Sequence, residues 1–230
     1  DFYNRFRDWR EKIYRKLGLE ATMSYDMLGQ RYALTDKGEG AASGEISFTA
    51  RWLIFGSRDY KYIPLSKNPI YLSCRIRNRH AYTDLAPSQL SYSNGLTWQS
   101  VDGFTAAGFQ IPDLYISQEL SGGNLILRYG QFTIDSFFDN HNLGSSKKYF
   151  FNAIFAKNPT VGFPSFGAGF TGQWQFGDDW DFSFGASNMQ GTDVTERVSF
   201  DLTSSALFYA VQGGHTFTGL GNHVVRAQLM

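Results

Sequence analysis

Two stretches of alternating side chains, 169–176 and 180–189, set the pattern for the second half of the chain. Large apolar side chains occupy most alternate positions in both stretches, and mostly small or polar side chains lie between them. Gly177-Asp178-Asp179 separates the two stretches, and a tight Gly-Asp turn between alternating segments predicts a β-hairpin. Aromatic side chains next to such a turn fit the wall of a membrane barrel, and a hairpin of a soluble β-sandwich is the alternative.

The same period of two recurs along most of the chain and predicts an all-β, antiparallel protein. Residues 81–110 carry loop signals with a short helical turn, and 149–156 fit either a short strand or a helical turn. The predicted strands are 19–28, 45–55, 70–79, 111–120, 124–132, 169–176, 180–189, 205–217 and 222–230.

The connections between the predicted strands alternate in length. Tight turns at one end and long loops at the other are typical of an outer-membrane β-barrel. This asymmetry favours a transmembrane barrel over a sandwich. The short connections lie near 121–124, 177–179 and 218–221, and the long ones near 29–44, 135–148 and 191–203.

Residues 1–17 differ from the rest and predict an amphipathic helix that ends at Gly18. Phe6, Trp9, Ile13 and Leu17 recur at helical spacing, and basic side chains occupy the other faces. Such a helix lies at a membrane interface or docks on a barrel mouth, or it packs as an ordinary helix on a sheet. The chain therefore divides into a helix at 1–17 and barrel strands over 18–230.

Three arginines share one face of the predicted strand 70–79. Arg75, Arg77 and Arg79 occupy alternate positions, with Ile70, Leu72, Cys74 and Ile76 on the opposite face, and they project at spacings of about 6–7 Å. Like charges in a row repel one another on the face of a small soluble sheet. In a water-filled lumen they form a donor-rich track for hydroxyl and carboxylate groups, and a plain solvated face is the alternative.

Composition narrows the function classes. The 230 residues carry a formal net charge of +0, so no nucleic-acid partner is indicated. Aromatic residues make up 17% of the chain and Gly numbers 24, a mix natural for a barrel with aromatic girdles. A lone cysteine, Cys74, excludes an internal disulfide and a cysteine metal cluster, and no metal or cofactor is predicted. The sequence contains no run of about eighteen apolar residues, so no transmembrane helix is predicted. The strands of a membrane barrel do not require such a run.

Several short motifs, in order, resemble the carbohydrate-selective porin family of the OprB type. Leu127-Arg128-Tyr129-Gly130-Gln131-Phe132 is followed by Asp135 and Asn158-Pro159, then by Phe163-Pro164 and Gly167-Ala168-Gly169. The amphipathic helix ending in Leu17-Gly18-Leu19 and the strand Leu114–Leu120 add to the likeness. It covers most of the chain and is weakest at 56–110.

The resemblance implies a barrel of about sixteen strands in the bacterial outer membrane. It also implies a constriction lined by arginines and acidic residues, through which sugars diffuse passively. Only nine or ten strands are recognisable, and no terminal aromatic residue closes the last one. An open sheet edge is not tolerated in lipid, so we expect the N-terminal portion of a longer chain. A closed barrel of ten strands is the alternative.

The leading hypothesis is a pore with hydrogen-bonding chemistry and no catalytic residues. Arginines supply donors, acidic residues supply acceptors and hold the guanidinium groups, and Tyr115 offers an aromatic surface to a sugar ring. The expected partners are small saccharides and outer-membrane lipids, and homo-oligomerisation is left open. The candidate pore-lining residues are Arg51, Arg75, Arg77, Arg79, Tyr115, Glu119, Arg128 and Asp135.

Two other classes stay open. A barrel enzyme that hydrolyses lipids or esters needs a nucleophile and a base, and the chain has four histidines, of which His80 ends the arginine strand. It has no nucleophile elbow and no helix-borne His-Glu-x-x-His pair. A soluble β-sheet protein that binds glycans is the other class, and it needs no detergent.

Overall fold

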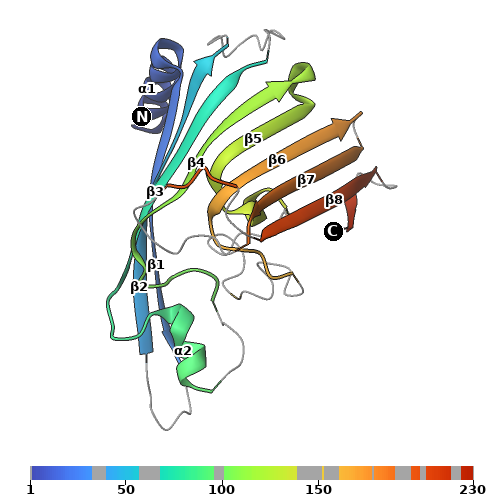
Figure 1. Ribbon diagram of the computed structural model, residues 1–230. Helices are drawn as coiled ribbons and strands as arrows, with labels where there is room; N and C mark the ends of the chain where they lie inside the picture. The colour runs from blue at the N-terminus through green and yellow to red at the C-terminus, as the bar shows by residue number, and fades with distance from the viewer. Residues whose placement is uncertain are drawn as a thin grey trace.

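Antiparallel strands joined in sequence order make up most of this computed structural model (Figure 1). It describes residues 2–32, 40–56, 68–95, 101–138, 152, 161–177, 179–189, 198–202, 206–218 and 224–229. Within these residues nine strands form one twisted sheet in the order β1 to β9. Their bounds are β1 Leu19–Arg31, β2 Gly40–Phe55, β3 Ile70–Ala81, β4 Gly108–Leu120, β5 Leu125–Phe132, β6 Gly167–Phe176, β7 Trp180–Asn188, β8 Leu207–Thr218 and β9 Val224–Leu229.

The structure confirms a strand at each of the nine predicted positions, with shifted ends. The loop predicted at 29–44 is wrong at both ends, because β1 continues to Arg31 and β2 begins at Gly40. This part of the hairpin consists of small and polar residues with low strand propensity, so the sequence pattern does not predict it. Backbone pairing between the two strands holds it in place. Helix α2 (Pro87–Ser93) is the predicted helical turn. The predictions for 139–148 and 149–156 lie outside the described residues, Asn152 excepted.

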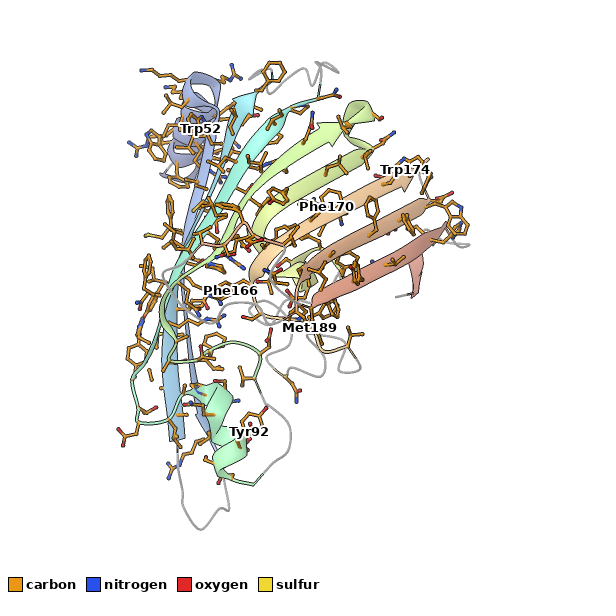
Figure 2. The ribbon with its side chains drawn as sticks, in the orientation of Figure 1. Trp52, Tyr92, Phe166, Phe170, Trp174 and Met189 are labelled. Carbon is orange, nitrogen blue, oxygen red and sulfur yellow. The ribbon has the colours of Figure 1, made fainter. Side chains whose placement is uncertain are left out.

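Alternation divides the side chains between two faces of the sheet. One face carries the arginines: Arg75 lies opposite Thr49 on β2 and Asp113 on β4. We name it the arginine face. The other face carries most of the large apolar side chains, including Phe170 and Trp174 on β6 (Figure 2), and we name it the aromatic face. The predicted division of residues between faces is confirmed.

The two ends of the sheet differ in their connections. At one end, named the short-turn end, η1 (Ser121–Gly123) joins β4 to β5, and three residues separate β6 from β7. The connection 56–69 at this end is an exception to the predicted alternation. At the long-loop end the strands are joined by 32–39, 82–107, 133–166 and 189–206.

Helix α1 (Phe2–Leu17) confirms the predicted amphipathic helix and adjoins β1 at the short-turn end (Figure 1). Gly18 ends it with a φ of 70° and donates its N–H to the Tyr14 carbonyl over 2.7 Å. Trp52 Nε1 on β2 donates to the Leu17 carbonyl over 2.9 Å, beside the helix in Figure 2. These bonds fix the end of the helix against the sheet. Among the described residues, no helix has the length and apolarity needed to cross a membrane.

A small apolar cluster covers part of the arginine face near the end of β5. Phe132 packs there with Ile134, Phe137 and Phe138, and Ala210 of β8 completes the buried set. The rings of Phe132 and Phe137 meet edge to face at 5.1 Å between centroids. Chain that follows β5 therefore folds back over the arginine face.

Residues 198–202, which we name the crossing segment, lie against the aromatic face. The N–H of Ser199 donates to Gln131 Oε1 over 2.7 Å, and the Tyr129 hydroxyl donates to the next carbonyl over 2.6 Å. On β7, Asn188 Nδ2 donates to another carbonyl of the segment over 2.8 Å. These bonds explain why Gln131, a polar residue of the aromatic face, is fully buried.

Candidate functional site

The arginines of β3 are paired with acidic side chains of the strands on either side. Arg79 Nε lies 2.5 Å from Glu45 Oε2 on β2. Arg75 Nε lies 2.6 Å from Asp113 Oδ2 on β4, the residue opposite it in the register. The repulsion expected between neighbouring arginines is therefore offset by carboxylates in the same face.

A third ion pair crosses the middle strand. Arg51 on β2 reaches over β3, and its Nη2 lies 2.6 Å from Glu119 Oε1 on β4. The guanidinium carbon lies 3.6 Å from the centroid of the Tyr71 ring on β3, a cation–π contact. The predicted role of Glu119, holding a guanidinium in place, matches this geometry.

The two remaining arginines have neutral partners. Arg77 Nε donates to Gln110 Oε1 over 2.8 Å, next to an irregularity in the β3–β4 register between Arg75 and Arg77. Arg128 on β5 places its guanidinium carbon 4.4 Å from the centroid of the Phe137 ring. We name the arginines 51, 75, 77, 79 and 128, with their partners, the arginine row.

Tyr115 and Asp135 lie next to the row. The Tyr115 ring meets Phe132 and Phe137 edge to face, with centroids 5.8 and 5.6 Å apart, so it joins the apolar cluster to the row. Asp135 lies in the turn η2 (Ile134–Ser136) that directly follows β5. A sugar-binding role for either residue stays a prediction.

Sequence reasoning missed several residues of the row. Glu45, Tyr71, Gln110 and Phe137 each contact an arginine, and none was among the candidates. Alternation alone places Glu45 and Tyr71 on the arginine face, and that signal was available. Phe137 follows β5 in irregular chain, where no periodicity indicates its direction.

The row offers hydrogen-bond donors in a fixed arrangement. A guanidinium carries five N–H donors, and a carboxylate takes at most two of them in a fork. One carboxylate or amide partner therefore cannot take all the donors of a guanidinium group. The acidic and amide partners hold the guanidinium planes, so these groups are already oriented.

Burial is inverted relative to a soluble sheet. On the arginine face Ser43 is fully buried and Glu45 is 4% exposed, whereas on the aromatic face Met23 is 74% exposed and Tyr209 71%. Soluble monomers rarely expose contiguous apolar patches larger than a few hundred Å². Other exposed apolar side chains of the aromatic face are Tyr25, Met27, Ile46, Phe48, Trp52, Ile54, Ile116, Tyr129, Trp174, Phe176, Trp180 and Val211.

The fold and the two faces define a class: an antiparallel sheet in sequence order, polar on one face and apolar on the other, as in the wall of an outer-membrane barrel. No protein-family model matches the sequence, and no curated protein matches it.

The fold is similar to that of a solved structure, the high-pH structure of Pseudomonas putida OprB. The TM-score is 0.68 at 12% identity, over 94% of this chain and 52% of that one. The low-pH structure of the same protein matches at 10% identity over 97% of this chain and 57% of that one. Its TM-score is 0.48. The chain thus has an OprB-like fold and spans about half the length of the structure it matches.

Proposed function

We propose that this protein is an outer-membrane porin through which small carbohydrates diffuse passively. The observation that carries the proposal is the inverted burial of the sheet, with charged and polar side chains on one face and exposed aromatic and aliphatic side chains on the other. In a bilayer the aromatic face meets lipid and the arginine face meets water. The OprB-like fold supports the same environment.

The proposal includes closure of the sheet into a barrel of about sixteen strands, the number implied by the family resemblance. Among the described residues β1 pairs with β2 alone and β9 with β8 alone. Unpaired strand edges cost several kcal/mol for each backbone group in hydrocarbon, so the edges need partners. The match to about half of OprB is consistent with a larger barrel.

The arginine row is the proposed contact surface for the solute. Its guanidinium groups donate to sugar hydroxyls, and its carboxylates accept from them. Each contact exchanges a bond to water for a bond to protein, so the net free energy is small and the sugar leaves readily. The pore makes and breaks no covalent bond, and we predict no enzymatic activity. His80 contacts Tyr25, Asn78 and Tyr82, a set without a serine nucleophile.

The test uses the full-length protein in planar bilayers and liposomes. Replacing Arg75 and Arg77 together with Ala should alter sugar flux and reduce anion preference. The matched control replaces Arg7 and Arg10 on α1, which are exposed and lie outside the row. Equal flux and selectivity in the wild type and the Arg75/Arg77 variant would remove the row from the transport path.

A gel test separates the barrel from a soluble glycan-binding protein. A barrel stays folded in detergent at room temperature and changes its mobility only after boiling. Solubility without detergent and one mobility before and after boiling would contradict the membrane assignment. Hydrolysis of an ester by the purified protein would instead favour the enzyme.

A further inference from the structure

A cavity of about 310 Å³ lies at the short-turn end of the sheet, and none of its lining residues belongs to the arginine row. Its size is at the lower limit of small-molecule sites, which run from about 300 to 1,000 Å³. The lining comes from η1 and the ends of β5 to β8 around that turn, and polar groups predominate. The residues used below are Asn124, Gln173, Gln175, Asp179, Asp181 and Ser183.

The chemistry of the cavity is complementary to that of the row. Carboxylates at Asp179 and Asp181 and amides at Gln173 and Gln175 bring many acceptor oxygens to one space. Ser183 also lines the cavity and is only 3% exposed. The cavity therefore offers mainly hydrogen-bond acceptors to a solute.

Backbone bonds fix the rim of the cavity. The N–H of Gln175 donates to the Asn124 carbonyl over 2.8 Å and joins β6 to the turn after η1. The N–H of Thr216 donates to the Asp179 carbonyl over 2.8 Å and joins β8 to the turn before β7. Gly214 makes room for a carboxylate, because a Cβ there would lie 2.5 Å from Asp181 Oδ1.

One lining residue lies close to the row along β5 and in the register. Ile126, one of its lining residues, pairs with Glu119 and lies two residues before Arg128 on β5. Two residues along a strand span about 7 Å, the length of one sugar ring and its substituents. A solute that leaves the donors of the row therefore meets the acceptors of the cavity next.

We propose that this cavity is a second saccharide subsite, specific for neutral hydroxyl-rich sugars, at the short-turn mouth of the pore. The inference rests on the proposed porin function and adds a site to it. Its acceptor oxygens accept hydrogen bonds from sugar hydroxyl groups, and its two carboxylates repel anionic sugars. The row, rich in positive charge, has the opposite preference.

The experiment records single-channel current noise of the full-length protein with D-glucose added from one side at a time. Asp181→Asn removes one charged acceptor, and we expect the residence time of glucose to fall on the order of tenfold. The fall should be larger for glucose added at the short-turn side. Asp201→Asn is the matched control, because it removes an exposed carboxylate from the crossing segment on the other face.

Gln175→Ala keeps the test decisive if Asp181→Asn fails to fold, because Gln175 is exposed and its side chain lines the cavity. A shorter residence time in this variant supports the subsite. Glucose noise that is unchanged in both variants overturns it and leaves the porin intact. A changed K⁺/Cl⁻ selectivity with unchanged glucose noise overturns it in favour of a cation site. No glucose noise and no glucose flux in the wild type overturns both the subsite and the proposed function.

Discussion

Replacing Glu119 with Gln isolates the contribution of one acid to the charge of the arginine row. Glu119 Oε1 lies 2.6 Å from Arg51 Nη2, and the two side chains are 25% and 42% exposed. Glutamine keeps the shape and an acceptor oxygen, so the hydrogen bond can persist while one negative charge is lost. We expect a folded protein whose arginine face carries one more uncompensated positive charge.

The size of the effect follows from Coulomb's law in water. An ion about 7 Å from the charge interacts by about 0.6 kcal/mol, and a Debye length of about 8 Å reduces this to about 0.25 kcal/mol. The charge attracts Cl⁻ and repels K⁺, so the difference between the two ions is about 0.5 kcal/mol. This corresponds to a change of about twofold in the permeability ratio. In about 10 mM salt the Debye length is about 30 Å, and the change grows to about fivefold.

The assay is the reversal potential of the full-length protein in planar bilayers under a KCl gradient, at both salt concentrations. Glu11→Gln on α1 is the control, because Glu11 forms the same kind of pair with Arg15 outside the sheet. If Glu119→Gln moves the reversal potential toward cation selectivity, or leaves it unchanged at both salt concentrations, the row does not lie in the ion path. A shift without salt dependence would refute the electrostatic reasoning.

Three further predictions concern stability. Gly130→Ala should lower the free energy of unfolding by about 2–4 kcal/mol or prevent folding, because φ at Gly130 is 147° and the new Cβ would lie 2.5 Å from a carbonyl oxygen of β4. Gly29→Ala is the control, because a Cβ at Gly29 meets open space, and gel mobility before and after boiling compares the two variants. Gln131→Leu should destabilise by about 1–3 kcal/mol and release the crossing segment to protease, and unchanged cleavage would contradict its role as an anchor. Trp52→Phe removes the bond to Leu17 and should speed hydrogen exchange in α1, and an unchanged exchange rate would show that the bond does not hold the helix.

The sequence by itself determined the class of fold and the face of the residues in most of the alternating segments. Period-two alternation requires only local backbone geometry, so Arg75 and Asp113 could be assigned to the polar set before any pairing was known. The same reasoning identified α1 from its helical spacing. It failed between β1 and β2, where Gly29 and its neighbours lack strand propensity and pairing alone extends the hairpin.

The tertiary structure decided which partners meet. Register and the irregularity beside Arg77 select its acceptor, and Arg51 reaches an acid two strands away, a contact that alternation cannot specify. The contact of Arg128 with the Phe137 ring and the position of the crossing segment on the aromatic face both involve chain outside the strands. The path of such irregular chain is set by the strand residues that it contacts. Local patterns assign faces because each residue's direction follows from its neighbours. Contacts between strands depend on relative shifts that no single segment encodes.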